Sequence, residues 1–278
     1  MLTTYAERQQ EAALREEIVR VCRLMWEKGF VAASDGNVSV RLGDDRLLTT
    51  PSGLSKGFLS PSDVVMTDMD GKPVRLFYHG DKQLKPSSEI LLHLEVYRQR
   101  PDVCAVVHAH PPLAIAFTIA GVSLAQCVLP EVVVNLGQVP TTAYATPATA
   151  EGPVVIRDLI RDHDALIIDR HGTVTVGPTL FDAYMKLEKV EHLAQVTLAA
   201  RQLGRVGLLP PEEVRKLVEM RRKALGLPPE YQGPGCVHCG ACGRETIGST
   251  ASSADASDEE LVRRVAETVV RELSRQLS

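Results

Sequence analysis

A strand-like segment that ends in two histidines constrains the fold of this chain more than any other stretch. Residues 103–111 read Val-Cys-Ala-Val-Val-His-Ala-His-Pro, an apolar run followed by His108 and His110. In a β-strand, residues i and i+2 point to the same face about 6.5–7 Å apart, so the two imidazole rings can converge on one point. This spacing is typical of a metal site, although a strand cap with one solvent-facing histidine gives the same pattern.

Composition limits the classes of protein to which the chain can belong. Its 278 residues, 44% of them hydrophobic, suffice for one large globular domain with an appendage. A formal net charge of −4 without a basic stripe disfavours nucleic acid as a partner, and no apolar run is long enough to cross a bilayer. The first residues contain no hydrophobic signal segment, so we expect a cytoplasmic protein.

Hydrophobic periodicity predicts a mixed α/β chain. Helices are expected at about 4–28, 87–99, 112–120, 152–162 and 179–203. Strands are expected at 37–41, 46–50, 64–68 with 73–75, 103–108, and 165–176 with a turn at 170–172. The apolar segment 128–134, which carries Glu131, is expected to be buried. His171 lies in the 170–172 turn beside a glycine that permits close approach of the backbone.

Three small-residue segments have the composition of anion-binding turns or helix starts. They contain Asn37, then Ser52 and Gly53, then Ser87 and Ser88. Free backbone N–H groups and the helix dipole favour an anion at such positions. Glu89 is expected in the first turn of the helix at 87–99, where the dipole favours its ionised form. Taken alone, the segment at Asn37 is better explained as an ordinary turn, and Glu89 as a surface acid that complements the helix dipole.

Taken in order, five motifs resemble one protein family. They are Gly-Asn-Val-Ser-Val-Arg (36–41), Thr-Pro-Ser-Gly (50–53), Ser-Ser-Glu (87–89), Val-Val-His-Ala-His (106–110) and Arg-His-Gly (170–172). Their order resembles the class II aldolase/adducin family, and within it the L-fuculose-1-phosphate aldolases. The resemblance implies a three-layer α/β/α class II aldolase fold with a central, mostly antiparallel sheet over residues 1–227.

The resemblance also implies the site residues. His108, His110 and His171 would bind one Zn²⁺ per subunit, and Glu89 would be both a fourth ligand without substrate and the catalytic acid/base. The phosphate of the substrate would be bound by Asn37, Ser52, Gly53, Ser87 and Ser88. Family members are homotetramers with active sites between subunits, which is implied here too.

The implied reaction is cleavage of L-fuculose 1-phosphate, or a similar deoxyketose 1-phosphate, to dihydroxyacetone phosphate and lactaldehyde. The alternatives are an L-ribulose-5-phosphate 4-epimerase or another sugar-phosphate lyase of the same fold. An adducin-like scaffold without chemistry has no need for the histidine and glutamate set. Leu129 stands where the fuculose-phosphate enzymes have an aromatic residue that helps to protonate the aldehyde oxygen, which leaves Glu131 and Tyr144 as candidates for that role.

Beyond residue 227 the composition changes. Residues 228–256 are a Gly/Pro/Ser-rich linker whose Cys236, Cys239 and Cys242 could bind zinc or an iron–sulfur cluster with His238, or remain a redox-labile linker. Residues 257–278 have the apolar stripe of an amphipathic helix. On its tether, this segment resembles encapsulation peptides that bind shell proteins of bacterial microcompartments. The alternatives are docking on its own domain or a coiled coil.

Overall fold

The computed structural model describes residues 4–227. The cysteine cluster at 236–242 and the helix predicted at 257–278 lie outside the described residues. No helix in the described range is long and apolar enough to span a membrane.

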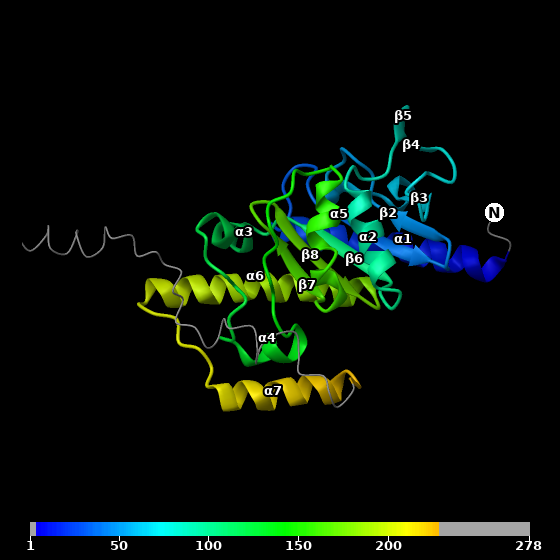
Figure 1. Ribbon diagram of the computed structural model, residues 1–278. Coiled ribbons are helices and arrows are strands. Elements are labelled where there is room, and N and C mark those ends of the chain that lie inside the picture. Colours follow the sequence, from blue (N-terminus) through cyan, green and yellow to red (C-terminus); the bar gives the residue numbers. More distant parts are fainter. Residues whose placement is uncertain (1–3, 228–278) are drawn as a thin grey trace, which may run out of the picture. The chain divides into compact units, whose positions relative to one another are not determined.

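A six-stranded antiparallel sheet forms the centre of the fold (Figure 1). Its order is β3 (Val65–Asp68), β2 (Arg46–Thr49), β1 (Asn37–Leu42), β6 (Ala105–Ala109), β8 (Gly172–Gly177) and β7 (Ala165–Ile168). All neighbouring pairs are antiparallel. In the register, Asn37 lies opposite His108, and His108 lies opposite Val174. The candidate metal and phosphate segments therefore meet at one end of the three central strands.

Helices cover both faces of the sheet, which confirms the predicted three-layer arrangement. α1 (Tyr5–Glu27) and α6 (Leu180–Gln202) pack on one face, and α2 (Ile90–Gln99) and α5 (Glu151–Ile156) pack on the other (Figure 1). Successive side chains of β6 point to opposite faces of the sheet. Ala105, Val107 and Ala109 belong to the hydrophobic cluster on the side of α1 and α6, and Val106 belongs to the cluster on the side of α2. His108 shares the face of Val106, so its side chain points to the layer that begins at Glu89.

The remaining elements border this sandwich. They are α3 (Pro112–Ile119), α4 (Pro130–Asn135), α7 (Pro211–Ala224), a hairpin of β4 (Phe77–His79) and β5 (Lys82–Leu84), and 3₁₀ turns at Lys56–Phe58, Pro61–Asp63 and Leu159–Arg161. The sequence did not predict α7 or the hairpin. The predicted helix at 152–162 divides into α5 and a 3₁₀ turn.

Two local predictions need correction. The predicted strand at 73–75 is reduced to a single bridge between Thr67 and Pro73, because proline has no N–H to donate to a ladder. Glu89 does not lie in the first turn of its helix but at the N-cap position before it. Its own N–H donates to the hydroxyl oxygen of Ser87 over 3.2 Å.

Candidate active site

The two histidines at the end of β6 converge as their spacing predicts. His108 is fully buried and His110 follows the strand on the same face. Their Nε2 atoms are 3.0 Å apart and their ring centroids 4.9 Å apart. Nδ1 of His108 donates to the carbonyl oxygen of Thr173 over 2.9 Å, so its Nε2 carries a lone pair.

His171 reaches the same point from the turn between β7 and β8. Its ring centroid lies 4.8 Å from that of His108 and 5.0 Å from that of His110. Arg170 before it has a left-handed backbone (φ 55°), and the Arg170 N–H donates to the Thr118 hydroxyl oxygen over 2.9 Å. This bond from α3 fixes the turn that carries His171.

Gly172 lets β8 approach the histidines closely. A Cβ atom there would lie 2.4 Å from the Ala109 carbonyl oxygen and 2.8 Å from Cδ2 of His110, both far inside contact distance. Any side chain at this position would push β8 away from the end of β6. The close approach expected at the 170–172 turn is therefore present.

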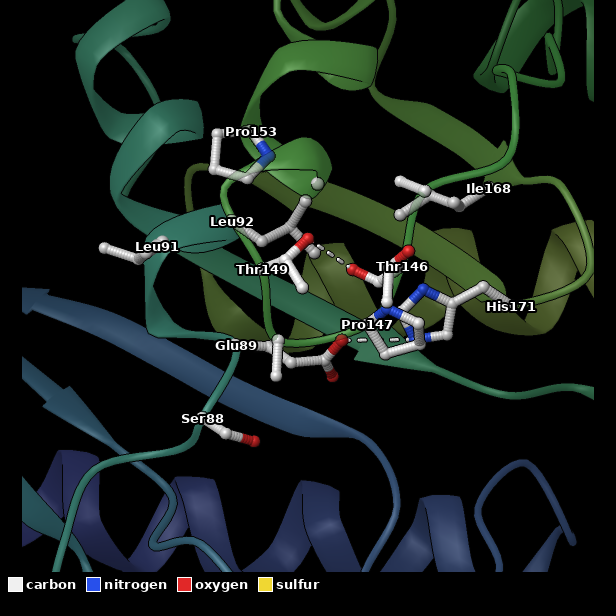
Figure 2. A pocket seen from close by; sticks show the side chains of 13 residues that line it. Ser88, Glu89, Leu91, Leu92, Thr146, Pro147, Thr149, Pro153, Ile168 and His171 are labelled. Carbon is white, nitrogen blue, oxygen red and sulfur yellow. Dashed lines mark hydrogen bonds and ion pairs between the residues drawn. The ribbon is translucent and has the colours of Figure 1, made fainter.

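Glu89 closes the cluster from the start of α2. One carboxylate oxygen lies 3.2 Å from Nε2 of His108 and accepts a 2.9 Å hydrogen bond from Nδ2 of Asn37. The other lies 3.1 Å from Nε2 of His171, as Figure 2 shows. Burial opposes ionisation, but the rings of His108 and His171 outweigh it and hold the pKa of Glu89 well below its usual range. The carboxylate is thus in the form that accepts a proton.

The donor set of this cluster fits a metal ion. One ligand atom from each of Glu89, His108, His110 and His171 lies within 4.8 Å of all the others. Among the described residues, Nε2 of His171 is buried without a hydrogen-bond partner of suitable geometry. Burial, followed by the neighbouring rings, lowers the pKa of His110 to about 3, so this imidazole is neutral at physiological pH. Three imidazoles and one carboxylate are ligands that suit Zn²⁺.

The candidate phosphate segments lie beside one another. The N–H of Ser52 donates to the carbonyl oxygen of Lys85, and the N–H of Ser87 donates to that of Thr50, over 3.0 and 3.1 Å. Ser52, Gly53 and Ser88 are exposed at this junction, whereas Ser87 is buried. Asn37 is also buried, and its amide contacts Glu89 and His93. Phosphate binding by the five residues stays a prediction.

Two lysines that the sequence did not single out border these segments. Lys56 is buried, and its ammonium donates to the carbonyl oxygens of Ser34 and Leu54, which joins the turn before Asn37 to the loop after Gly53. Lys82, on the β4–β5 hairpin, has its ammonium 3.8 Å from the position that a Cβ on Gly53 would occupy. Lys56 begins a 3₁₀ turn and Lys82 begins a three-residue strand, and elements this short have little hydrophobic periodicity, so neither lysine gave a sequence signal.

A narrow pocket opens beside Glu89 and His171. Its other wall is the loop that contains Thr146, Pro147 and Thr149, which Figure 2 shows next to both side chains. Tyr144, 54% exposed, immediately precedes this loop. Glu131 lies at the start of α4 and is not part of the four-residue cluster, and Leu129 packs against the core between α3 and α6.

Comparison with known proteins decides the family. The model of the Class II Aldolase and Adducin N-terminal domain matches residues 16–198. The chain belongs to this family. Membership makes it a lyase-type protein of the class II aldolases, and the family's use of metal agrees with the observed cluster.

Relatives of this class II aldolase differ in the reactions that they are named for. L-fuculose phosphate aldolase from Methanococcus vannielii is 34% identical over 181 residues, which are 65% of this chain and 93% of that protein. 3-Oxo-tetronate 4-phosphate decarboxylase from Escherichia coli is 33% identical over 190 residues, 67% of this chain and 86% of that protein. The crystal structure of a putative aldolase/epimerase/decarboxylase from Escherichia coli matches with a TM-score of 0.67 and 30% identity, covering 75% of this chain and 99% of that one.

Proposed function

We propose that this class II aldolase is a zinc-dependent enzyme that cleaves L-fuculose 1-phosphate, or a similar deoxyketose 1-phosphate, to dihydroxyacetone phosphate and lactaldehyde. The observation that carries the proposal is the carboxylate of Glu89, held between His108 and His171 next to two exposed loops of phosphate-binding composition. A base and a metal-ligand set beside a phosphate site are what this reaction needs.

Glu89 is the proton-transfer group in this proposal. Cleavage breaks the C3–C4 bond of the ketose: the C4 hydroxyl gives its proton to water, the aldehyde leaves, and the bonding electron pair remains on C3 next to the carbonyl. Glu89, protonated from water, then delivers a proton to C3, so that no proton is gained or lost overall. In the reverse direction its carboxylate removes the same proton. When bound by the three histidines, zinc supplies Lewis-acid stabilisation of the negative charge on the neighbouring oxygens.

Lys82 is expected to strengthen binding of the phosphate. Replacing it with alanine removes a positive charge next to Gly53. Because the side chain is exposed, the effect is modest: we expect KM to rise about fivefold with kcat nearly unchanged. Steady-state kinetics measure both constants. Lys72→Ala, at an exposed turn after β3, is the matched control and should leave KM unchanged. An unchanged KM for Lys82→Ala contradicts this role.

A decarboxylase that acts on a sugar-acid phosphate is the second candidate, because the Escherichia coli decarboxylase is nearly as similar to this chain as the aldolase is. Both reactions break a carbon–carbon bond and leave an electron pair next to a carbonyl, so the same metal and base serve either one. An epimerase of this fold would break and re-form such a bond without releasing a fragment.

Product analysis separates these candidates. Zinc-loaded and chelator-stripped protein are each incubated with L-fuculose 1-phosphate, other deoxyketose 1-phosphates, 3-oxo-tetronate 4-phosphate and L-ribulose 5-phosphate. The proposal predicts zinc-dependent release of dihydroxyacetone phosphate from a deoxyketose 1-phosphate. Release of carbon dioxide from 3-oxo-tetronate 4-phosphate would contradict the proposal and favour the decarboxylase. Epimerisation of L-ribulose 5-phosphate without cleavage would contradict it and favour the epimerase.

Two proposals concern assembly and rest on the sequence and the family. We propose a homotetramer with active sites between subunits, which sedimentation of the purified chain tests.

We also propose that residues 257–278 direct the enzyme to shell proteins of a bacterial microcompartment, where the shell would confine the aldehyde. If a chain lacking residues 244–278 enters shells as well as the full chain does, the targeting proposal is wrong.

A further inference from the structure

A line of buried polar side chains leads through the interface between β1 and α2 to Glu89. Its members alternate between the two elements: Tyr97 and His93 from α2, Ser39 and Asn37 from β1. Each of the four is at most 3% exposed. The positions i and i+2 on a strand, and i and i+4 on a helix, give each element one polar face toward the other.

Each member of this line contacts the next at hydrogen-bond distance. The Tyr97 hydroxyl lies 2.8 Å from the Ser39 oxygen, and the Ser39 oxygen lies 2.6 Å from Nδ1 of His93. Nε2 of His93 lies 2.5 Å from Oδ1 of Asn37, whose Nδ2 donates to Glu89 over 2.9 Å. Such a line is costly to bury unless every group is paired, and here every group is paired.

The carboxylate at the end of the line fixes the direction of every bond. An ionised Glu89 only accepts, so Asn37 must turn its NH₂ group toward Glu89 and its carbonyl oxygen toward His93. His93 must then carry its proton on Nε2. Burial lowers the pKa of His93 to about 3, so the ring is neutral and its Nδ1 accepts from the Ser39 hydroxyl. Ser39 in turn accepts from Tyr97.

We propose that His93 is a positioning residue. Ser39 and Tyr97 hold its ring as the Nε2–H tautomer. In this form the ring keeps the Asn37 amide turned so that the amide donates to the carboxylate of Glu89. Without the ring, the amide can rotate by half a turn and present its carbonyl oxygen to the carboxylate. Two oxygens would then repel each other, and Glu89 would leave the place it holds between His108 and His171.

The tautomer is tested directly, without substrate or turnover. In protein labelled with ¹⁵N-histidine, two-bond proton–nitrogen correlations show which ring nitrogen carries the proton. We expect His93 to have its proton on Nε2 and a bare Nδ1 from about pH 6 to pH 8, because its pKa lies near 3. A proton on Nδ1, or on both nitrogens, overturns the proposal.

Kinetics test the positioning role with a pair of variants of similar size. His93→Leu removes both polar atoms and should lower kcat about 30-fold, with KM and zinc content little changed. Effects of about this size are typical when a residue that orients a metal-binding side chain by hydrogen bonding is lost. His93→Gln keeps one donor and one acceptor and should recover most of that loss. A kcat for His93→Leu within threefold of the wild type, or an equal loss in both variants, overturns the proposal.

A matched control and a milder variant keep this test decisive. His163→Leu makes the same change at another buried histidine, whose Nδ1 contacts the Leu159 carbonyl, and should leave kcat unchanged. If His93→Leu does not fold, Ser39→Ala removes only the hydroxyl that sets the tautomer and should lower kcat about fivefold. An unchanged kcat in Ser39→Ala then overturns the proposal.

The kinetic part rests on the proposed function, in which Glu89 transfers the proton. The two can fail separately. A wild-type protein that turns over none of the sugar phosphates contradicts the proposed function, whereas the tautomer of His93 is still measured. An active wild type with a fully active His93→Leu variant contradicts only the positioning role.

Discussion

Replacing His108 with alanine is expected to lower kcat/KM about 10⁴-fold, because losing a ligand removes charge stabilisation worth several kcal/mol, and each 1.4 kcal/mol is a factor of ten. His108 is the fully buried member of the cluster, and its Nε2 faces both His110 and Glu89. Zinc content by elemental analysis should fall from one per chain to a small fraction.

The control for this variant is His192→Ala, which removes an exposed histidine of α6 outside the cluster. It should retain full zinc and full activity. A His108→Ala protein that keeps its zinc and its activity would show that the four-residue cluster is not the catalytic metal site. Loss of activity with zinc retained would show that His108 is needed for catalysis but not for holding the metal.

Replacing Glu89 with glutamine is expected to abolish proton transfer while leaving the histidines in place. General acid–base groups typically contribute about 10²–10⁴-fold, and we expect a loss of about 10³-fold in kcat. The direct measurement is exchange of a hydroxymethyl proton of dihydroxyacetone phosphate with deuterated solvent, followed by NMR in the absence of aldehyde. Wild-type enzyme should catalyse this exchange, and the variant should not.

Glu16→Gln, on the exposed side of α1, is the matched control and should exchange at the wild-type rate. Zinc content distinguishes a chemical from a structural effect in Glu89→Gln, because the three histidines alone should still hold the metal. Exchange at the wild-type rate in Glu89→Gln would assign the base to another residue. Loss of both zinc and exchange would make Glu89 chiefly a ligand.

The metal cluster could be anticipated from the sequence because strand geometry is periodic. Val106, His108 and His110 are spaced by two residues, so they point to the same side at the end of β6. Gly172 predicted a close approach that the structure contains. The long helices α1 and α6 were predictable from their apolar stripes. Glu89 was placed one position too far into its helix, since helix ends depend on local bonds such as that to Ser87.

What the sequence did not reveal depends on contacts between distant segments. His93 reads as an ordinary polar position of a buried helix, and only its pairing with Asn37 and Ser39 across the interface with β1 shows a role. Lys56 lies in a 3₁₀ turn and Lys82 in a three-residue strand, whose positions are fixed by packing rather than by periodicity. The β4–β5 hairpin was missed because its two three-residue strands bury only Phe77 and Leu84. The sequence did contain a signal for α7, since Val214 and Val218 are buried four residues apart on one helical face.

Stoichiometric zinc reconstitution tests the central claim most directly. Chelator-stripped protein is titrated with zinc while dihydroxyacetone phosphate release from L-fuculose 1-phosphate is followed with a coupled dehydrogenase. The account predicts activity that rises linearly and reaches its plateau at one zinc per chain, with no recovery in His108→Ala. Full activity in the stripped protein, or a plateau reached equally by His108→Ala, would contradict it.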